Sequence, residues 1–213
     1  MEIKKMPVAP IGANCYIVSE KGKAFIIDPG GDAGKIICAV ENLEVRYILL
    51  THAHFDHIGG LNEIKKAFPK AKTAIHKLEK EWLYSTELNL SENFDFDFVY
   101  EKEVNTEFED GTKLDFAGTK INVIHTPGHT PGSSCFYIEK SEVCESPVLF
   151  SGDTLFRNSI GRTDFPEGNG RKIIESIKNK LLLLPDETVV YPGHDENTSI
   201  FLEKKLNPFL KRI

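Results

Sequence analysis

The stretch THAHFDH, residues 51–57, concentrates side chains that bind metal ions. It contains His52, His54, Asp56 and His57, and therefore three of the seven histidines in the chain. Imidazole and carboxylate groups are the usual protein ligands of zinc and iron. A strand would place His52, His54 and Asp56 on one face, whereas a tight loop would turn them toward one point. His57 follows immediately and would point elsewhere, so this one segment could serve two ions.

A metal ion needs three or four protein ligands, so other ligands must come from distant segments. The candidates are His129 in TPGHTPGS, Asp153 in SGDTLF and His194 in YPGHDENTS. Each alone is better explained as a loop residue bonded to the backbone, or as a cap. Taken with THAHFDH, however, five of the seven histidines and two aspartates fall in such loops, and this combination predicts a metal centre. Of the other histidines, His76 is predicted to be structural, and His125 is a weaker candidate for supporting a ligand.

Each candidate loop follows an apolar run that predicts a buried strand. YILL precedes His52, INVI precedes the loop of His129, VLFS precedes Asp153 and VVY precedes the loop of His194. Strand ends are where rigid scaffolds present functional groups. Strands are expected at 14–19, 23–31, 45–54, 72–76, 113–129 (a pair), 132–140, 146–153 and 187–194.

Helices are expected between these strands, from apolar residues at helical spacing. The expected ranges are 32–43 with Asp32 as N-cap, 59–69, 77–86, 169–185 and 199–210. Residues 87–110 show no clear period and are interpreted as a surface excursion. Strands alternating with helices predict an α/β layered architecture with the helices outside.

Composition limits the classes of function. A chain of 213 residues with 40% hydrophobic and 27% charged residues is typical of one globular domain. A net charge of −6 and a pI near 5.7 argue against nucleic-acid partners. No apolar run is long enough to span a membrane, and no apolar run follows the N-terminal lysines as in a secretory signal. The four cysteines show no CxxC spacing and are expected to be free thiols of a cytoplasmic protein.

The motifs THAHFDH, TPGHTPGS, SGDTLF and YPGH, in that order, resemble those of the metallo-β-lactamase superfamily. Within it, GANCYIV, FIIDPGG and GRTDFPEGN resemble the short, single-domain glyoxalase II-like (hydroxyacylglutathione hydrolase-like) enzymes. The resemblance runs from about residue 7 to NPFL near the C-terminus. It implies a four-layer αββα sandwich, with a metal site at one edge between two sheets. It also implies that residues 1–213 form one hydrolase domain without the helical C-terminal domain of full-length glyoxalase II.

The resemblance also implies a ligand set for two divalent metal ions, with zinc favoured and iron or manganese possible. One metal takes His52, His54 and His129, the other takes Asp56, His57 and His194, and Asp153 bridges them. Two such ions share a bridging hydroxide that attacks an acyl carbon near neutral pH. Asp56 is then both a ligand and the candidate catalytic base.

The preferred activity is hydrolysis of a small-molecule thiolester such as S-lactoylglutathione. The alternatives are a persulfide dioxygenase with one iron on His52, His129 (or His54) and Asp153, another hydrolase of the superfamily, or a metal-binding module without catalysis. The segment GRTDF resembles the dioxygenases as well. A β-lactam substrate is disfavoured, because the commonest β-lactamases of the superfamily place a cysteine in the second metal site.

Without the helical domain, substrate contacts are expected from the loop FRNSIGRTDFPEG, residues 156–168. Arg162 stands where the family places a basic residue facing the substrate carboxylate, and a guanidinium binds a carboxylate through two hydrogen bonds. The alternative for Arg162 is an ion pair with Asp164 that holds the loop. Phe156 and Tyr191, with Phe165, are candidates for pocket walls, although aromatic residues at strand ends are more often core residues.

Overall fold

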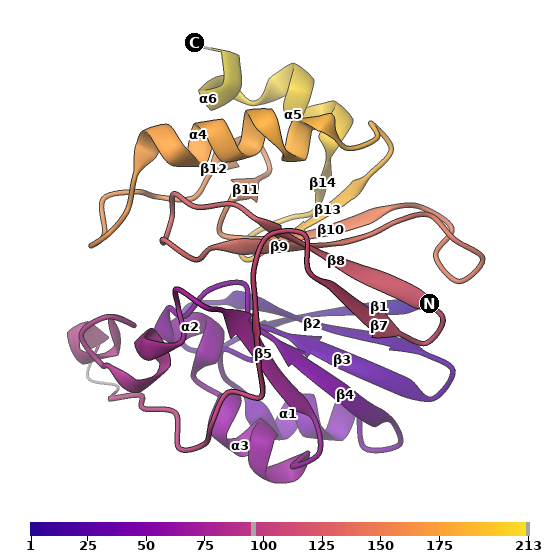
Figure 1. Ribbon diagram of the computed structural model, residues 1–213, viewed down its shortest axis with the longest axis vertical. Coiled ribbons are helices and arrows are strands. Elements are labelled where there is room, and N and C mark those ends of the chain that lie inside the picture. Colours follow the sequence, from indigo (N-terminus) through magenta and orange to yellow (C-terminus); the bar gives the residue numbers. More distant parts are fainter. Residues whose placement is uncertain (95–96, 212–213) are drawn as a thin grey trace. The chain divides into compact units, whose positions relative to one another are not determined.

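A six-stranded mixed sheet organises the first of two compact units, Met1–Phe108, in the computed structural model (Figure 1). The structure describes residues 1–94 and 97–211. The strands follow one another in sheet order: β1 Glu2–Val8, β2 Ala13–Glu20, β3 Lys23–Ile27, β4 Glu44–Leu49, β5 Lys72–His76 and β6 Thr106–Phe108. β1, β2 and β3 are antiparallel, and β3 to β6 are parallel.

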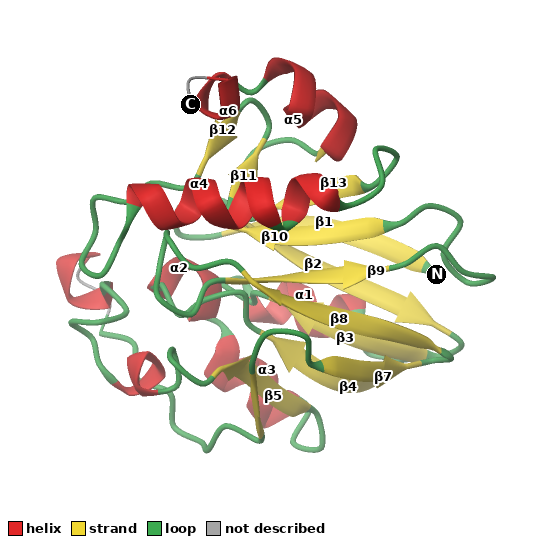
Figure 2. Ribbon diagram, turned by 45° about the horizontal axis from the view of Figure 1, so that its top comes forward, coloured by secondary structure: helices red, strands yellow, loops and turns green. Residues whose placement is uncertain are grey.

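The helices of the first unit occupy the connections between its parallel strands, which cannot be joined by tight turns. They are α1 Ala33–Ala39, α2 Phe55–Ile58 and α3 Leu61–Ala67. α1 and α3 lie on one face of the sheet (Figures 1 and 2). Their Ile36 and Ile64 are fully buried in one apolar cluster with Ile26 of β3 and Ile48 of β4. This core fixes the carboxyl end of β4, where THAHFDH begins.

A second six-stranded sheet organises Glu109–Ile213, in the order β14-β13-β10-β9-β8-β7. Its strands are β7 Lys113–Phe116, β8 Thr119–His125, β9 Ser134–Ile138, β10 Val148–Gly152, β13 Val189–Pro192 and β14 Thr198–Ser199. β10 and β13 are parallel, and the other neighbouring pairs are antiparallel. β11 Leu155–Phe156 and β12 Ser159–Ile160 form a separate small hairpin. The two-sheet α/β class expected from the sequence is confirmed.

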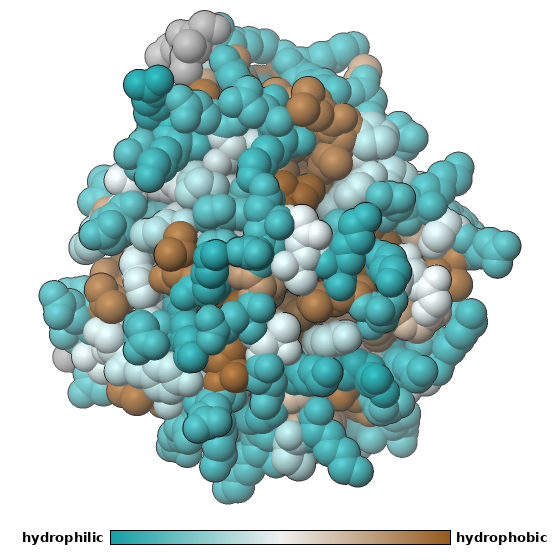
Figure 3. Space-filling model, in the orientation of Figure 1, coloured by the Kyte–Doolittle hydropathy of each residue, from teal (hydrophilic) through white to brown (hydrophobic). Residues whose placement is uncertain are grey.

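The helices of the second unit are α4 Gly170–Asn179, α5 Ile200–Leu206 and α6 Pro208–Lys211, with the 3₁₀ turn η3 Leu181–Leu183. Ile173 and Ile177 of α4 pack in one cluster with Leu149 of β10 and Val190 of β13. On the face drawn in Figure 3, hydrophilic side chains predominate and apolar ones form separate patches, one of them over α5. Within the described ranges, every helix is too short or too polar to cross a lipid bilayer.

The structure corrects two of the expected elements and adds a strand, β1, that was not expected. Residues 77–86 contain only a 3₁₀ turn, η1 Glu81–Tyr84, rather than a helix. The expected helix 199–210 is divided, because Pro208 lacks an N–H and forces Asn207 into an extended conformation (ψ 115°). β1 was not expected, because Pro7 and two lysines interrupt its pattern; both are typical of an edge strand.

Residues 87–110 are also more ordered than a surface excursion. The side-chain amide of Asn89 is buried and donates to the carbonyls of Trp82 (3.2 Å) and Phe98 (3.0 Å). Phe98 and Tyr100 join the apolar core of the first unit, and the segment ends in β6. A second 3₁₀ turn, η2 Ser91–Phe94, lies within it. Residues 95 and 96 of this segment lie outside the described residues.

Candidate metal centre

THAHFDH is a loop followed by a helical turn, not a continued strand. β4 ends at Leu49, and α2 begins at Phe55 directly after His54. His52 and His54 therefore project from the loop, whereas Asp56 and His57 project from α2. All four side chains are almost completely buried. The ring of His52 lies 4.8 Å from that of His54 and 4.2 Å from that of His57, measured between centroids, so the segment brings its ligand-type groups to one place.

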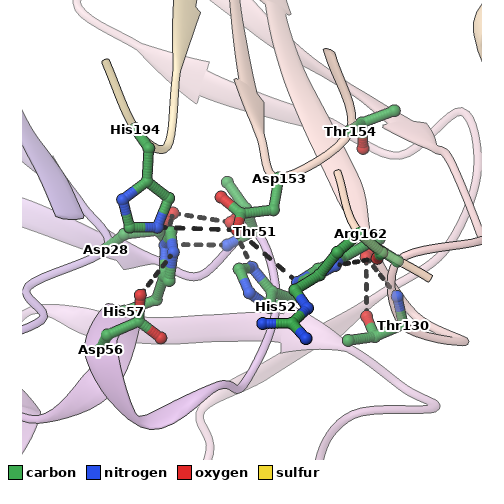
Figure 4. Close-up of polar contacts among 12 residues, drawn as sticks. Asp28, Thr51, His52, Asp56, His57, Thr130, Asp153, Thr154, Arg162 and His194 are labelled. Atoms are coloured by element: carbon green, nitrogen blue, oxygen red, sulfur yellow. Dashed lines mark hydrogen bonds and ion pairs between the residues drawn. The ribbon is translucent and has the colours of Figure 1, made fainter. Parts of the chain in front are cut away.

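Asp28 orients two of these histidines, and the sequence analysis assigned it no role. Its Oδ2 accepts the hydroxyl of Thr51 (2.6 Å) and lies 3.0 Å from Nδ1 of His57, while its Oδ1 accepts the Thr51 amide (2.8 Å) (Figure 4). The Thr51 hydroxyl donates its single proton to Asp28, and it therefore accepts a hydrogen bond from Nδ1 of His52, 3.0 Å away. Both imidazoles thus hold a proton on Nδ1 and keep the Nε2 lone pair for a metal. The available signal was Asp28 at the strand end in FIIDPGG.

Two further contacts fix the backbone of the segment. The buried carboxylate of Glu79 accepts the amide of Ala53 at 3.0 Å, between His52 and His54. Gly30 lies against α2, where a Cβ would stand 1.6 Å from the carbonyl oxygen of Asp56. Only glycine allows this approach. No sequence pattern pointed to Glu79, because the contact joins segments far apart in the chain.

The second unit brings His129, Asp153 and His194 together. Nε2 of His129 and Nε2 of His194 each lie 3.6 Å from the same oxygen, Oδ2 of Asp153. Figure 4 shows the contact between His194 and Asp153. Asp153 and His194 are neighbours because they follow the parallel strands β10 and β13, whose ends are joined by a 2.9 Å hydrogen bond from the Gly193 amide to the Gly152 carbonyl. Asp153 thus lies between the two imidazoles, as a carboxylate would if it were shared by two metals that each take one of these histidines.

His129 is oriented by a backbone group. Its Nδ1 lies 2.7 Å from the carbonyl oxygen of Arg162, which can only accept, so Nδ1 carries the proton and the lone pair is on Nε2, the nitrogen that faces Asp153. The loop itself is held by α4. The Asn169 amide donates to the Gly128 carbonyl (2.7 Å), and the Ser176 hydroxyl donates to the Pro127 carbonyl (2.9 Å).

Comparison with known proteins identifies the family. The family model for the metallo-beta-lactamase superfamily matches residues 8–194. The chain belongs to the metallo-β-lactamase superfamily. It is 38% identical over 212 residues to the probable metallo-hydrolase YqgX of Bacillus subtilis, covering 99% of this chain and 98% of YqgX. It is 37% identical over 217 residues to the hydroxyacylglutathione hydrolase GloC of Haemophilus influenzae, covering 99% and 98% of the two chains.

Solved structures agree with this membership of the superfamily. The crystal structure of BLEG-1, described as a B3 metallo-β-lactamase, is 39% identical with a TM-score of 0.92 over 99% of this chain and 100% of that one. TTHA1623 in a di-iron-bound form is 32% identical, with a TM-score of 0.84 over 97% and 100%. ETHE1 from Myxococcus xanthus is 26% identical, with a TM-score of 0.76 over 98% and 84%.

The donor set fits the divalent metals of a metallo-hydrolase. Five imidazoles and two carboxylates suit zinc, iron or manganese, and the partners of Nδ1 described above leave the outer nitrogens of His52, His57 and His129 for ligation. The thiols do not compete. Cys15, Cys135 and Cys144 are free and buried, and Cys38 is free and exposed. Burial raises the pKa of the Cys135 thiol to about 11, so it stays protonated at neutral pH.

The other singled-out residues have ordinary structural contacts. The exposed guanidinium of Arg162 forms two hydrogen bonds to Asp164 (2.8 and 2.7 Å) and lies 3.9 Å above the ring centre of Phe165. This is the ion pair that was considered as the alternative to substrate binding. Tyr191 stacks on Phe150 at 5.3 Å. Phe156 lies edge-on to His194, with ring centres 6.2 Å apart.

The two remaining histidines bond to the backbone. Nε2 of His125 lies 2.8 Å from the Pro131 carbonyl, in the same loop that carries His129, and burial lowers the pKa of His125. This contact suits the supporting role considered for it. His76 is buried, and its Nδ1 accepts the Leu78 amide at 3.3 Å, as a structural histidine would.

Proposed function

We propose that the protein hydrolyses a thiolester with the help of two divalent metal ions, most suitably zinc. The observation that carries the proposal is the matched orientation of the candidate ligands within each unit. His52 and His57 are held through Nδ1 by Thr51 and Asp28, and His129 through Nδ1 by the Arg162 carbonyl. Such supporting bonds are the usual companions of metal-ligating histidines.

The proposed ligands are those implied by the family resemblance. His52, His54 and His129 hold one metal, Asp56, His57 and His194 hold the other, and Asp153 is shared. Metal ions held there would supply a more acidic water and Lewis-acid polarisation of a substrate carbonyl. The similarity to GloC of Haemophilus influenzae, described as a hydroxyacylglutathione hydrolase, supports a thiolester as the substrate.

Asp56 has two proposed roles. Its Oδ2 lies 3.5 Å from Nε2 of His57, so the two side chains face the same point. One carboxylate oxygen can ligate while the other accepts the proton of the attacking water, which makes Asp56 the general base. No cysteine or serine nucleophile is required, and the buried thiols stay protonated.

The decisive experiment combines metal analysis with turnover. We expect two metal ions per chain and hydrolysis of S-lactoylglutathione, followed by the released thiol. Asp56→Asn should lower kcat by at least about a hundredfold, because general-base catalysis contributes typically 10²–10⁴-fold. Glu41→Gln, at an exposed position of the same unit, should leave kcat unchanged. The proposal fails if a fully metallated enzyme releases no thiol from any thiolester tested.

A second candidate is persulfide dioxygenation by a single iron. The resemblance of GRTDF, residues 161–165, to the dioxygenases favours it. The di-iron form of TTHA1623 adds that a related protein binds iron. One iron per chain on His52, His129 and Asp153, with oxygen consumed in the presence of glutathione persulfide, would establish this activity in place of hydrolysis.

The similarity to BLEG-1 makes a β-lactam a further substrate to test in the same turnover assays. BLEG-1 is described as a B3 metallo-β-lactamase and aligns over nearly the whole chain, although the motifs of this chain place no cysteine in the second metal site, where the commonest β-lactamases of the superfamily have one. A chromogenic cephalosporin should be turned over far more slowly than the thiolester. The reverse order of kcat/KM would assign the chain to β-lactam hydrolysis.

A further inference from the structure

The first unit contains an apolar cavity of about 560 Å³, which is within the usual size of small-molecule pockets. It lies between the β1–β2 loop, residues 9–11, the turn of residues 30–33 and the segment from α2 to the start of α3. Ile11, Phe55 and Phe94 supply its large apolar side chains. Ile11 and Phe94 are half exposed, so the cavity opens to solvent along an apolar rim.

The cavity shares its wall with the candidate metal ligands. Phe55 directly precedes Asp56 on α2, and Gly30 touches the backbone of Asp56. The same turn begins at Asp28, which holds His57 at 3.0 Å. A group in this cavity therefore lies next to the α2 turn that carries Asp56 and His57.

The walls of the cavity are held by interactions of their own. Asp32 accepts the amide of Ala9 at 3.1 Å and pairs with Lys35 at 3.0 Å, which ties the β1–β2 loop to the start of α1. Asp32 occupies the expected N-cap position of α1, but its side chain makes no capping bond to that helix. Phe55 and Phe94 stack with ring centres 4.4 Å apart. The cavity is thus preformed, which lowers the entropic cost of binding.

The charges at the cavity indicate which part of a substrate it would accept. Asp32 and Glu63 are the charged residues among its described lining, which includes no lysine or arginine. A carboxylate, such as those of glutathione, would be repelled there, whereas an apolar group would be buried favourably.

We propose that this cavity binds the acyl group of the substrate and gives the enzyme a preference for medium-chain apolar acyl groups over lactoyl or acetyl. The inference rests on the proposed thiolester hydrolysis and adds the substrate class to it. The acyl part is the occupant because the thiol carriers are polar or charged, whereas an acyl chain matches Ile11, Phe55 and Phe94.

The first test compares octanoyl and acetyl esters of one neutral thiol, N-acetylcysteamine. The wild type should show a kcat/KM at least tenfold higher for octanoyl. Ile11→Asp and, independently, Phe94→Ser should reduce this ratio by at least tenfold. Leu78→Asp is the matched control, since Leu78 is 51% exposed against 53% for Ile11, lies in the same unit and does not line the cavity. It should keep the wild-type ratio.

A binding measurement separates this inference from the proposed function. The probe is the ketone analogue of the octanoyl ester, in which a methylene group separates carbonyl and sulfur so that hydrolysis cannot occur. By calorimetry, the wild type and Leu78→Asp should bind it at least tenfold more tightly than Ile11→Asp does. Equal affinities together with equal chain-length ratios would overturn the acyl assignment while leaving hydrolysis intact. Tight, Ile11-dependent binding without hydrolysis of either ester would instead overturn the proposed hydrolysis.

Discussion

At the scale of single residues, the candidate ligands are held by neighbours that the ligand motif does not contain. Asp28 contacts both Thr51 and His57, and the Thr51 hydroxyl in turn holds the ring of His52 by a hydrogen bond. One carboxylate therefore sets the ring positions of two histidines. The backbone of Asp28 has a positive φ of 49°, and that of Asp32 has a positive φ of 48°. The two aspartates therefore share a backbone conformation but make different side-chain contacts.

Asp28→Asn should weaken metal binding without unfolding the turn. Asparagine tolerates a positive φ, but its amide would present a donor to the protonated Nδ1 of His57. We expect metal affinity to fall by about 10–100-fold, as for other supporting residues of metal sites, measured by competition with a chromogenic chelator. Asp32→Asn, whose carboxylate holds the β1–β2 loop, should retain the wild-type affinity. Equal losses in the two variants would contradict the role of Asp28.

The Arg162–Asp164 pair gives a prediction on pH. The hydrogen bond from Arg162 holds the pKa of Asp164 at about 2. Since that pKa is depressed, the pair's contribution to stability is present above the ordinary value of roughly 3.9 and is lost as the pH falls toward about 2. A carboxyl NMR titration should place the Asp164 midpoint near 2. In Arg162→Gln the midpoint should move up toward the ordinary value. An unmoved midpoint would show that another group lowers it.

At the scale of elements, the loop of His129 depends on α4. The side chain of Asn169 caps this helix, and its backbone N–H donates to the Gly128 carbonyl. The Ser176 hydroxyl donates to the Pro127 carbonyl. Gly128 adopts a φ of 146°, and a Cβ there would stand 2.3 Å from the Ile173 amide nitrogen. The helix and the loop are therefore in backbone contact, and the position of His129 follows that of α4.

Gly128→Ala should accordingly be more damaging than an ordinary glycine replacement. Overpacking against fixed backbone costs about 1–3 kcal/mol, in addition to about 1–3 kcal/mol for holding a non-glycine residue in a sparsely populated backbone conformation. Gly111→Ala is the control, because Gly111 also has a positive φ (78°) but meets nothing within 4 Å. Urea denaturation should show a loss of stability for Gly128→Ala about twofold or more above that for Gly111→Ala. Similar losses would mean that the loop of Gly128 can move away from α4 at little cost in stability.

At the scale of the whole molecule, the elements that could be predicted are those whose own residues show a hydrophobic pattern. The strands before His52, Asp153 and His194 appear as apolar runs, and the structure has β4, β10 and β13 there. The hydrophobic period of residues 169–185 likewise predicted a helix, which the structure has over Gly170–Asn179, whereas the last part of the range contains the 3₁₀ turn Leu181–Leu183. These are segments whose own side chains carry the signal.

The unpredicted parts depend on tertiary contacts. Glu79 and Asn89 are polar residues that are buried because they have hydrogen-bond partners in other segments. The partner of Glu79 is the Ala53 amide, and the partners of Asn89 are the carbonyls of Trp82 and Phe98. Residues 77–86 have apolar residues at helical spacing but fold as a 3₁₀ turn, which leaves the Leu83 carbonyl to accept the Tyr100 amide at 2.8 Å. Whether residues 1–213 act as one domain stays a prediction.

Metal removal gives a prediction for the entire chain. An ion that binds only the folded protein stabilises it by about 2.7 kcal/mol at a hundredfold excess over Kd, and each kcal/mol shifts Tm by about 2–4 °C in chains of this size. Dialysis against EDTA should therefore lower Tm by roughly 5–10 °C, and zinc should restore it, as followed by calorimetry. His54→Ala should respond less, since it lacks a proposed ligand. Identical Tm values with and without EDTA would contradict a metal bound by the folded chain.

The hydrogen bond between His129 and Arg162 is made by the peptide carbonyl of Arg162, not by its guanidinium. Alanine scanning would delete the guanidinium and leave this bond in place, so a mild phenotype for Arg162→Ala would reveal nothing about the orientation of His129. A thioamide at this linkage, which replaces the carbonyl oxygen with the weaker acceptor sulfur, is the change that would expose its contribution.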